Sequence, residues 1–305
     1  MRRTQAFVCL AIVGAATFMT GCARQGIATL PVIEVSTWAM PPAGASVPAP
    51  RCVTRGLHGE MLALDTIGRV IVFDEAGKAT RTWMMPETKA GRPEAIHVLR
   101  DGRIAVADTH YHRILFFSQD GNLLEMFGAY GTGPGEFIYP VAITEDPEGN
   151  LYIAEYGSND RIQKFTADGT FRLSFGTFGT GQGQFQRPSG IVWHDRRLYV
   201  ADAINNRIQV FSQDGQWIAD LGNESATSFR FPYDIDISGD GRLFIVEYGA
   251  GRITALDLSG HIIGRYGRTG DAIGEFATPW GISVDGDTRI RVADTGNRRI
   301  VELRL

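Results

Sequence analysis

Six prolines recur at similar spacing along the sequence, and several residues that follow them have side chains suited to binding chemistry. In chain order, the residues directly after these prolines are Arg51, Glu94, Val141, Ser189, Tyr233 and Trp280. Asp234 comes one position later and adds a second carboxylate. Aromatic rings with a few charged groups are typical of a pocket for a small molecule or a peptide. The candidate ligand-binding residues are therefore Arg51, Glu94, Ser189, Tyr233, Asp234 and Trp280.

A structural role is the alternative interpretation of the same residues. Arg51 and Glu94 have opposite charges and could simply pair with each other at a solvated rim. Tyr233 and Trp280 could fill space without contacting a ligand. The sequence leaves both interpretations open.

Two tyrosines extend the set of candidates. Tyr156 and Tyr248 each stand between a glutamate and a glycine, directly after a short apolar run. We expect both on loops close to the residues that follow the prolines. They could enlarge a binding surface, or they could pack over their own turns, and we favour packing.

Metal-binding patterns in the sequence are incomplete. His110 and His112 are two residues apart, so in an extended chain they would point the same way and could share a metal. No third ligand accompanies them. Asp234 and Asp236 similarly lack the further oxygen ligands that calcium requires. We therefore expect no metal, no cofactor and no catalytic residue.

A second repeated pattern combines an acid with an arginine. Six short apolar runs end in an acid, and the distances between these acids are 43, 47, 47, 45 and 47 residues. The acids are Asp65, Asp108, Glu155, Asp202, Glu247 and Asp294. An arginine follows each of them after four to six residues, at Arg69, Arg113, Arg161, Arg207, Arg252 and Arg299. A feature that recurs in every copy is expected to fasten a turn by charge-assisted hydrogen bonds, not to catalyse a reaction.

The elements that position these residues are short strands. A full copy contains a strand after the proline, a strand ending in the acid, a strand beginning at the arginine, and a fourth strand after a turn that ends in glycine. Four antiparallel strands repeated every 40–50 residues or so are typical of β-propellers, with one repeat per blade. The sequence therefore predicts an all-β fold, a six-bladed β-propeller of four-stranded antiparallel blades.

The two ends of the chain are predicted to complete one blade together. The last copy, from Pro279 to Leu305, contains only three strands. The segment Leu30–Trp38 precedes the first copy and alternates in the way an outer strand should. We expect it to pair with the C-terminal strand, which closes the ring and protects a strand edge. Residues 40–50 would then connect it to the first blade.

Residues 1–21 have the pattern of a secretory signal peptide. Two arginines precede an apolar run over residues 6–19, and Gly21 and Cys22 follow. The ending resembles a bacterial lipobox, which implies lipidation of Cys22; an ordinary signal peptide with an incidental cysteine is the alternative. Ala23 is not an acid, and by resemblance to bacterial sorting patterns this suggests the outer membrane. The predicted organisation is a signal peptide over 1–21, a tether over 22–29 and a propeller over 30–305.

The charge balance argues against a nucleic-acid partner. The sequence has 30 basic and 34 acidic residues and a formal net charge of −4. Loss of residues 1–21 would remove two arginines and no acid, which leaves a net charge of about −6. Binding to nucleic acid depends on neutralising phosphates and therefore needs a basic face. Only Cys52 would remain as an unmodified cysteine, so no internal disulfide is expected.

The repeats resemble those of the NHL-repeat propeller family, in its bacterial lipoprotein form. The matching residues include GEFIYPVAITEDPEGNLYIAEYGSNDRIQKFTADG and GQFQRPSGIVWHDRRLYVADAINNRIQVFSQDG. The resemblance extends from about Pro50 to Leu305 and implies the propeller fold. It leaves function open, because one fold can support enzymes, binding modules and scaffolds.

The resemblance includes one catalytic group, the peptidyl-α-hydroxyglycine lyases, in which zinc-binding histidines follow the blade prolines. No histidine follows a blade proline here, although His97 lies on an inner strand. We therefore expect a lipid-anchored, monomeric binding module that faces the periplasm of a bacterial cell envelope. Its partner would be an envelope protein, a peptide or a glycan, bound at the channel mouth. The alternative is a metal-dependent propeller lyase or hydrolase.

Overall fold

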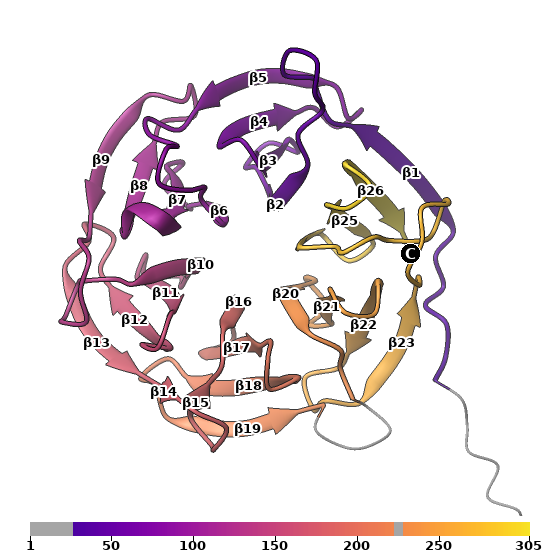
Figure 1. Ribbon diagram of the computed structural model, residues 1–305. Helices are drawn as coiled ribbons and strands as arrows, with labels where there is room; N and C mark the ends of the chain where they lie inside the picture. Colours follow the sequence, from indigo (N-terminus) through magenta and orange to yellow (C-terminus); the bar gives the residue numbers. More distant parts are fainter. Residues whose placement is uncertain (1–26, 223–227) are drawn as a thin grey trace, which may run out of the picture.

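The computed structural model describes residues 27–222 and 228–305. These residues form six four-stranded antiparallel sheets arranged as a ring (Figure 1). The fold is all-β, with one short 3-10 turn at Thr109–Tyr111. The predicted signal peptide and Cys22 lie outside the described residues. The described part of the chain has no helix with the length and apolar character needed to cross a bilayer.

The first three blades follow the chain from the inside of the ring to the outside. Blade 1 contains β2 (Pro50–Arg55), β3 (Met61–Asp65), β4 (Arg69–Phe73) and β5 (Ala79–Met84). Blade 2 contains β6 (Ala95–Val98), β7 (Ile104–Asp108), β8 (Arg113–Phe117) and β9 (Leu123–Phe127). Blade 3 contains β10 (Tyr139–Glu145), β11 (Leu151–Tyr156), β12 (Arg161–Phe165) and β13 (Phe171–Phe175).

The next two blades repeat this order. A small parallel pair, β14 (Thr177–Phe178) and β15 (Gln184–Phe185), lies in the connection to blade 4. Blade 4 contains β16 (Pro188–His194), β17 (Arg197–Asp202), β18 (Arg207–Ser212) and β19 (Trp217–Leu221). Blade 5 contains β20 (Pro232–Ile237), β21 (Leu243–Glu247), β22 (Arg252–Leu256) and β23 (Ile262–Tyr266).

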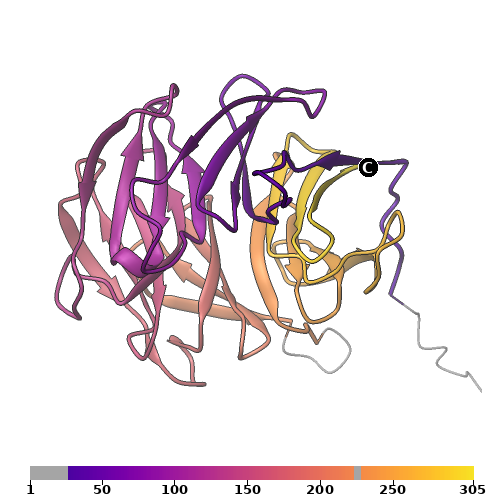
Figure 2. The same ribbon diagram turned by 45° about the horizontal axis from the view of Figure 1, so that its top comes forward.

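Blade 6 combines the two ends of the chain, as the sequence predicts. It contains β24 (Gly281–Asp285), β25 (Arg289–Asp294), β26 (Arg299–Arg304) and the N-terminal β1 (Glu34–Ala39). β1 pairs antiparallel with β26, from Glu34 opposite Arg304 to Ala39 opposite Arg299. Both views show β1 on the rim of the ring beside the C-terminal strand (Figure 1; Figure 2). This pairing covers a strand edge that would otherwise be open.

The N-terminal segment differs from the prediction in where its strand begins. The expected strand covered Leu30–Trp38, whereas β1 begins at Glu34. The preceding residues contact blade 5 instead, because Leu30 donates its N–H to the Arg265 carbonyl and Thr29 pairs in parallel with the same residue. The side chain of Leu30 is buried there. The N-terminal segment therefore joins blades 5 and 6 as well as closing the ring.

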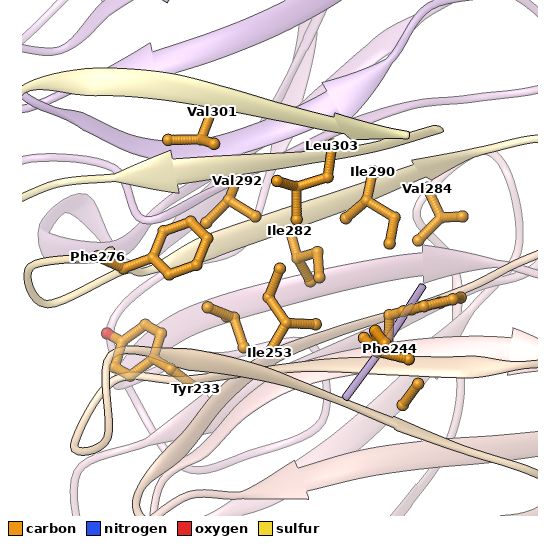
Figure 3. Packing of buried hydrophobic residues seen from close by; sticks show 13 residues of the cluster. Tyr233, Phe244, Ile253, Phe276, Ile282, Val284, Ile290, Val292, Val301 and Leu303 are labelled. Carbon is orange, nitrogen blue, oxygen red and sulfur yellow. The ribbon is translucent and has the colours of Figure 1, made fainter. Parts of the chain in front are cut away.

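Apolar side chains fill the space between neighbouring sheets. Between blades 5 and 6 the buried residues include Phe244, Ile253, Ile282, Val292 and Leu303 (Figure 3). The second strand is fully buried in blades 1, 2 and 5, and in the other three blades it is buried except for one end residue. For this reason it reads in the sequence as a continuous apolar run. A β-sheet buried on both faces gains its stability mainly from this apolar contact.

The acid–arginine pairs fasten the blades, as predicted. In all six, the arginine Nε lies 2.7–2.9 Å from a carboxylate oxygen of the acid, and each acid side chain is fully buried. In blades 3 to 6 the second carboxylate oxygen accepts a backbone N–H two residues before the blade proline. In these four blades the pair therefore connects the middle of the blade to the loop that leads into its inner strand.

Candidate functional site: the channel mouth

The inner strands of the six blades surround a cavity on the axis of the ring. The cavity has a volume of about 280 Å³ and is lined by residues of β2, β6, β10, β16, β20 and β24. Arg51, Glu94, Tyr233 and Trp280 line it near the starts of these strands. The residues that follow the blade prolines therefore gather at one end of the cavity, which we call the channel mouth.

The strand starts are irregular, and this irregularity affects the mouth residues. In β2, β10, β16 and β20 the pairing register shifts between the proline and the residue two positions later. The residue between them is a β-bulge, which redirects a side chain relative to a regular strand. Arg51, Ser189 and Tyr233 occupy such positions.

Small residues one position further on allow the inner strands to approach each other. A Cβ added at Gly190 would lie 2.7 Å from the Asp234 Cα, and one added at Gly281 would lie 2.9 Å from the Cys52 Cα. Neither distance leaves room for a side chain. The convergence of the strands on the axis therefore requires glycine in blades 4 and 6.

Glu94 is the centre of a buried polar network at the mouth. Its carboxylate accepts Nη2 of Arg51 at 3.1 Å and Nη2 of Arg187 at 3.4 Å. The Tyr233 hydroxyl donates to the same carboxylate at 3.3 Å and accepts Nη2 of Arg187 at 2.8 Å. The Glu94 side chain is only 4% exposed, so the predicted pair of Arg51 and Glu94 exists but is buried and not solvated.

Aromatic rings hold both arginines. The Arg51 guanidinium lies 4.3 Å from the ring centre of Trp280, and the Arg187 guanidinium lies 4.3 Å from that of Tyr156. Trp280 and Tyr233 are stacked with their centres 5.0 Å apart. Tyr248 packs near both, at 6.0 Å from Tyr233 and 6.4 Å from Trp280. Cation–π contacts of this kind orient a guanidinium plane while leaving its N–H edges available.

Tyr156 and Tyr248 combine the two roles that the sequence left open. Both tyrosines pack, Tyr156 against Tyr139 with centres 5.2 Å apart and Tyr248 against Phe231 at 5.6 Å. Both also belong to the aromatic surroundings of the mouth. Packing and participation in the site are compatible here.

Arg187 is a mouth residue that the sequence analysis did not identify. It directly precedes Pro188 and has a positive φ of 62°, which is unusual for a residue with a side chain. Its backbone N–H donates to the Asp160 carboxylate at 2.6 Å, which holds this conformation. The signal in the sequence was the place of Arg187 directly before a blade proline. The neighbouring blade prolines follow other residue types, so no repeated pattern indicated Arg187.

Ser189 and Asp234, both predicted ligand-binding residues, make contacts between blades. The Ser189 hydroxyl donates to the Tyr233 carbonyl at 2.6 Å. The Asp234 carboxylate accepts the backbone N–H of Ile235 at 2.9 Å and that of Ile282 at 3.0 Å. Asp236 accepts the N–H of Val284 in the same way. These side chains therefore satisfy the free edge of a neighbouring inner strand.

The environment of Asp234 favours its protonated form. Burial in the channel wall raises the pKa of Asp234 to about 7, although its two backbone N–H bonds act in the opposite direction. Burial also raises the pKa of Asp236. Further along the channel, burial and the charges of Arg55 and Arg100 lower the pKa of His97 to about 4. The channel wall thus disfavours charge on groups of either sign.

The two candidate metal-binding histidines contact aromatic rings and backbone. The ring centre of His110 lies 5.5 Å from that of Tyr139, and the ring of His112 is hydrogen-bonded to the Ile138 carbonyl. Within residues 27–222 and 228–305, no group of three or more His, Cys, Asp or Glu side chains is placed to hold a metal ion.

Comparison with known proteins agrees with the repeats and the fold. A family model described as a 6-bladed beta-propeller matches residues 87–173. Human NHL repeat-containing protein 3 is 28% identical over 199 residues, which cover 60% of this chain and 56% of that protein. Protein brain tumor of Drosophila melanogaster is 26% identical over 177 residues, 57% of this chain and 12% of that protein. The chain thus spans less than two thirds of the length of these relatives.

Solved structures with the same architecture include enzymes. A virginiamycin B lyase from Staphylococcus aureus, solved as a catalytically inactive variant with quinupristin, has a TM-score of 0.64 and 19% identity, covering 89% of this chain and 99% of that chain. A protein of unknown function from Bacteroides thetaiotaomicron has a TM-score of 0.67 and 18% identity, covering 88% and 75%. At these identities the similarity concerns the fold alone. Together, the repeats, the six sheets and these relatives identify the chain as a six-bladed β-propeller whose repeats are similar to those of NHL repeat-containing proteins.

Proposed function

We propose that this propeller is a binding module that engages a protein, peptide or glycan partner at the channel mouth. One observation carries the proposal: each of the six blades contributes one residue to a single cluster at the mouth. In blade order these residues are Arg51, Glu94, Tyr156, Arg187, Tyr233 and Trp280. The cluster does not follow the repeat, since the six blades supply two arginines, two tyrosines, a glutamate and a tryptophan. Conserving the fold does not require such a mixture, whereas recognition of a ligand does.

The size of the cavity limits what part of a partner could enter. A volume of about 280 Å³ is close to the lower end for small-molecule pockets. A whole folded partner would therefore remain on the surface around the mouth. Only a small group, such as a terminal residue or a single sugar, would reach the mouth cluster.

The proposed cellular setting depends on the N-terminal segment. Lipidation of Cys22 would anchor a monomeric propeller to a bacterial envelope membrane, with the outer membrane facing the periplasm as the proposed site. Two or more acyl chains would make this anchoring stable. Mass spectrometry of the mature N-terminus would test it, and a Cys22→Ala variant recovered in the membrane fraction would contradict it.

A capture experiment tests the mouth as the binding surface. Tagged wild-type chain would be incubated with envelope extract beside a Trp280→Ala/Tyr248→Ala variant. Trp217→Ala is the matched control, because it removes a half-buried tryptophan from the outer strand β19. We expect the double variant to lose partners that wild type and control both retain. Equal capture by all three proteins would reject the mouth as the binding surface.

A metal-dependent lyase is the second candidate function, and the fold of the streptogramin-type lyases motivates it. No histidine of this chain follows a blade proline, so the resemblance to zinc-dependent lyases does not carry over to those positions. Metal analysis of the purified chain separates the two candidates. Zinc or calcium bound in a stoichiometric amount, together with its loss in a His110→Ala/His112→Ala variant, would favour the enzyme.

A further inference from the structure

We propose that the channel mouth recognises a carboxylate group of its ligand, held between the guanidiniums of Arg51 and Arg187. This inference rests on the proposed binding function and specifies the chemistry of the ligand.

Each mouth arginine uses a small part of its hydrogen-bonding capacity. Among the described residues, the Arg51 side chain donates only through Nη2, to Glu94, and the Arg187 side chain donates only through Nη2, to Glu94 and Tyr233. The Nε atoms of both arginines are buried and have no partner. A guanidinium carries five N–H donors in a fixed plane, so both retain donors for another acceptor.

The anchor arginines of the same molecule show the contrast. All six place Nε on a carboxylate oxygen at 2.7–2.9 Å. Within the described part of the chain, a buried Nε without a partner therefore occurs at the mouth and at none of the anchors. The Nε atoms themselves are covered, so the donors left for a ligand oxygen are the Nη1 groups of Arg51 and Arg187, which make no hydrogen bond and are not among the buried atoms.

Glu94 shows that the space between the two arginines accommodates a carboxylate. Its two oxygens are shared, one facing Arg51 and the other facing Arg187. Neither contact is bidentate, and the distances of 3.1 and 3.4 Å are longer than those of the anchors. Two guanidiniums thus face one carboxylate. The nearby Asp160 carboxylate accepts the backbone N–H of Arg187 and not its guanidinium. A second carboxylate would complete the pairing.

The aromatic contacts fix the orientation in which a carboxylate would be bound. Trp280 covers the face of the Arg51 guanidinium, and Tyr156 covers that of Arg187. A guanidinium stacked in this way presents its N–H edge, which matches the two oxygens of a carboxylate. Arg51, Glu94 and Tyr233 line the cavity of about 280 Å³, and Arg187 is hydrogen-bonded to Glu94 and Tyr233. This volume admits a small acidic group, such as a peptide C-terminus or an acidic sugar. Both sources share the carboxylate.

Paired ligands that differ only in charge test the proposal. The purified full chain would be titrated with N-acetylphenylalanine and its neutral amide, with glucuronate and glucose, and with inorganic phosphate, by calorimetry and by thermal stability. We expect a carboxylate to bind and to raise the melting temperature, whereas its neutral counterpart does neither. Binding of N-acetylphenylalanine alone would identify a peptide C-terminus, and binding of glucuronate alone would identify an acidic sugar.

Variants show whether the binding occurs at the mouth. Glu94→Gln removes the competing internal carboxylate and should tighten binding about tenfold, whereas Arg187→Gln should weaken it by at least about that factor. Arg51→Lys and Arg187→Lys keep the charge but lose Nε–H, so they preserve the test if the glutamine variant does not fold. Arg81→Gln is the charge-matched control, because Arg81 lies on the outer strand β5, away from the cavity, and its pair with Asp120 is exposed.

Three results would overturn the proposal. They are equal binding of acids and neutral counterparts, equal binding of phosphate, and no binding of any carboxylate at millimolar concentration. If a captured partner is lost in Trp280→Ala/Tyr248→Ala but retained in both lysine variants, carboxylate recognition fails while the proposed binding function stands. If neither set of variants affects capture, both fail.

Discussion

Arginine meets a carboxylate in two regions of this molecule, at the six blade anchors and at the channel mouth. At an anchor, the acid is fully buried and the arginine Nε is hydrogen-bonded to it; Asp202, for example, also accepts the side chains of Asn205 and Gln209 and a backbone N–H. At the mouth, Glu94 is buried too, but its contacts are longer and the arginine Nε atoms are unpartnered. The pair is thus saturated at this anchor and unsaturated at the mouth; among the anchors, Asp108 is an exception, because its Oδ1 is buried without a partner.

This difference separates pairs that stabilise the fold from pairs that could recognise a ligand. A saturated buried pair cannot accept another partner without losing an existing bond, so it holds the structure. An unsaturated pair keeps donors available at a structural cost, which is a reason to look for a ligand there. The repeat pattern supports this distinction, because the anchors recur in every blade and the mouth cluster does not.

The largest effect is expected when an anchor loses its arginine. Arg207→Met would leave the Asp202 carboxylate buried without its cation and should lower the free energy of unfolding by about 3–5 kcal/mol. Arg81→Ala is the control, because the Arg81–Asp120 pair is exposed on both sides and should contribute at most about 1 kcal/mol. Urea unfolding measures both. Equal losses in the two variants would contradict the structural role of the anchor.

The second prediction tests whether Asp234 stabilises the fold, through the dependence of stability on pH. The pKa of Asp234 is about 7 in the folded chain, against an ordinary value of 3.8. Between these values the unfolded chain has released the proton and the folded chain retains it, so this group's contribution to stability is present at low pH and is lost as pH rises towards 7. Each pKa unit corresponds to about 1.4 kcal/mol, so the expected loss is on the order of 4 kcal/mol.

Asp234→Asn should remove this pH-dependent contribution. The measurement is the free energy of unfolding of wild type and variant at several pH values from 4 to 8. The difference between wild type and variant should decline as pH rises. A difference that stays constant would mean that Asp234 is ionised throughout, and would return it to the list of charged candidates for ligand contact.

The third prediction compares two anchors. The Asp202 carboxylate accepts several donors, whereas Oδ1 of Asp108 is buried without a partner. Asp202→Asn should therefore lower the free energy of unfolding by about 2–3 kcal/mol, and Asp108→Asn by only about 1 kcal/mol. The same unfolding measurements apply. A larger loss for Asp108→Asn would show that counting hydrogen bonds does not rank the anchors.

The smallest effect on stability is expected at the mouth. Glu94→Gln keeps an acceptor for one guanidinium, and both guanidiniums retain their aromatic contacts. We expect the free energy of unfolding to fall by about 1 kcal/mol or less. A loss as large as that of Arg207→Met would place Glu94 with the anchors and would weaken the case for a ligand site.

Much of the fold could be predicted because it depends on local, repeated patterns. The spacing of the anchor acids and arginines predicted the strands, the turns and the number of blades. The last copy has only three strands, and this predicted the pairing of β1 with β26. Residues that follow the prolines were correctly expected to meet at one mouth. The start of β1 was wrong by four residues, because Leu30 contacts β23 of blade 5 and not β26.

The composition of the mouth cluster was harder to predict. Arg187 and Glu94 are far apart in the sequence, and nothing local indicates that they meet. The positive φ of Arg187 and the β-bulge at Arg51 and Tyr233 redirect side chains in ways that residue types do not reveal. Asp234 was expected to be a charged contact for a ligand, but its hydrogen bond to the Ile282 N–H became apparent only once blades 5 and 6 lay side by side.

The sequence by itself determined the all-β class, the six blades, the closure of the ring by the two chain ends and the pairing within each anchor. All of these follow from patterns repeated within about fifty residues, where strand alternation and turn chemistry act locally. Only the tertiary structure decided which side chains from different blades share the mouth, which arginine donors are unpartnered and which acids serve neighbouring strand edges. The physical reason is that these contacts form across the axis of a closed ring, so they depend on how all six sheets pack and not on any one of them.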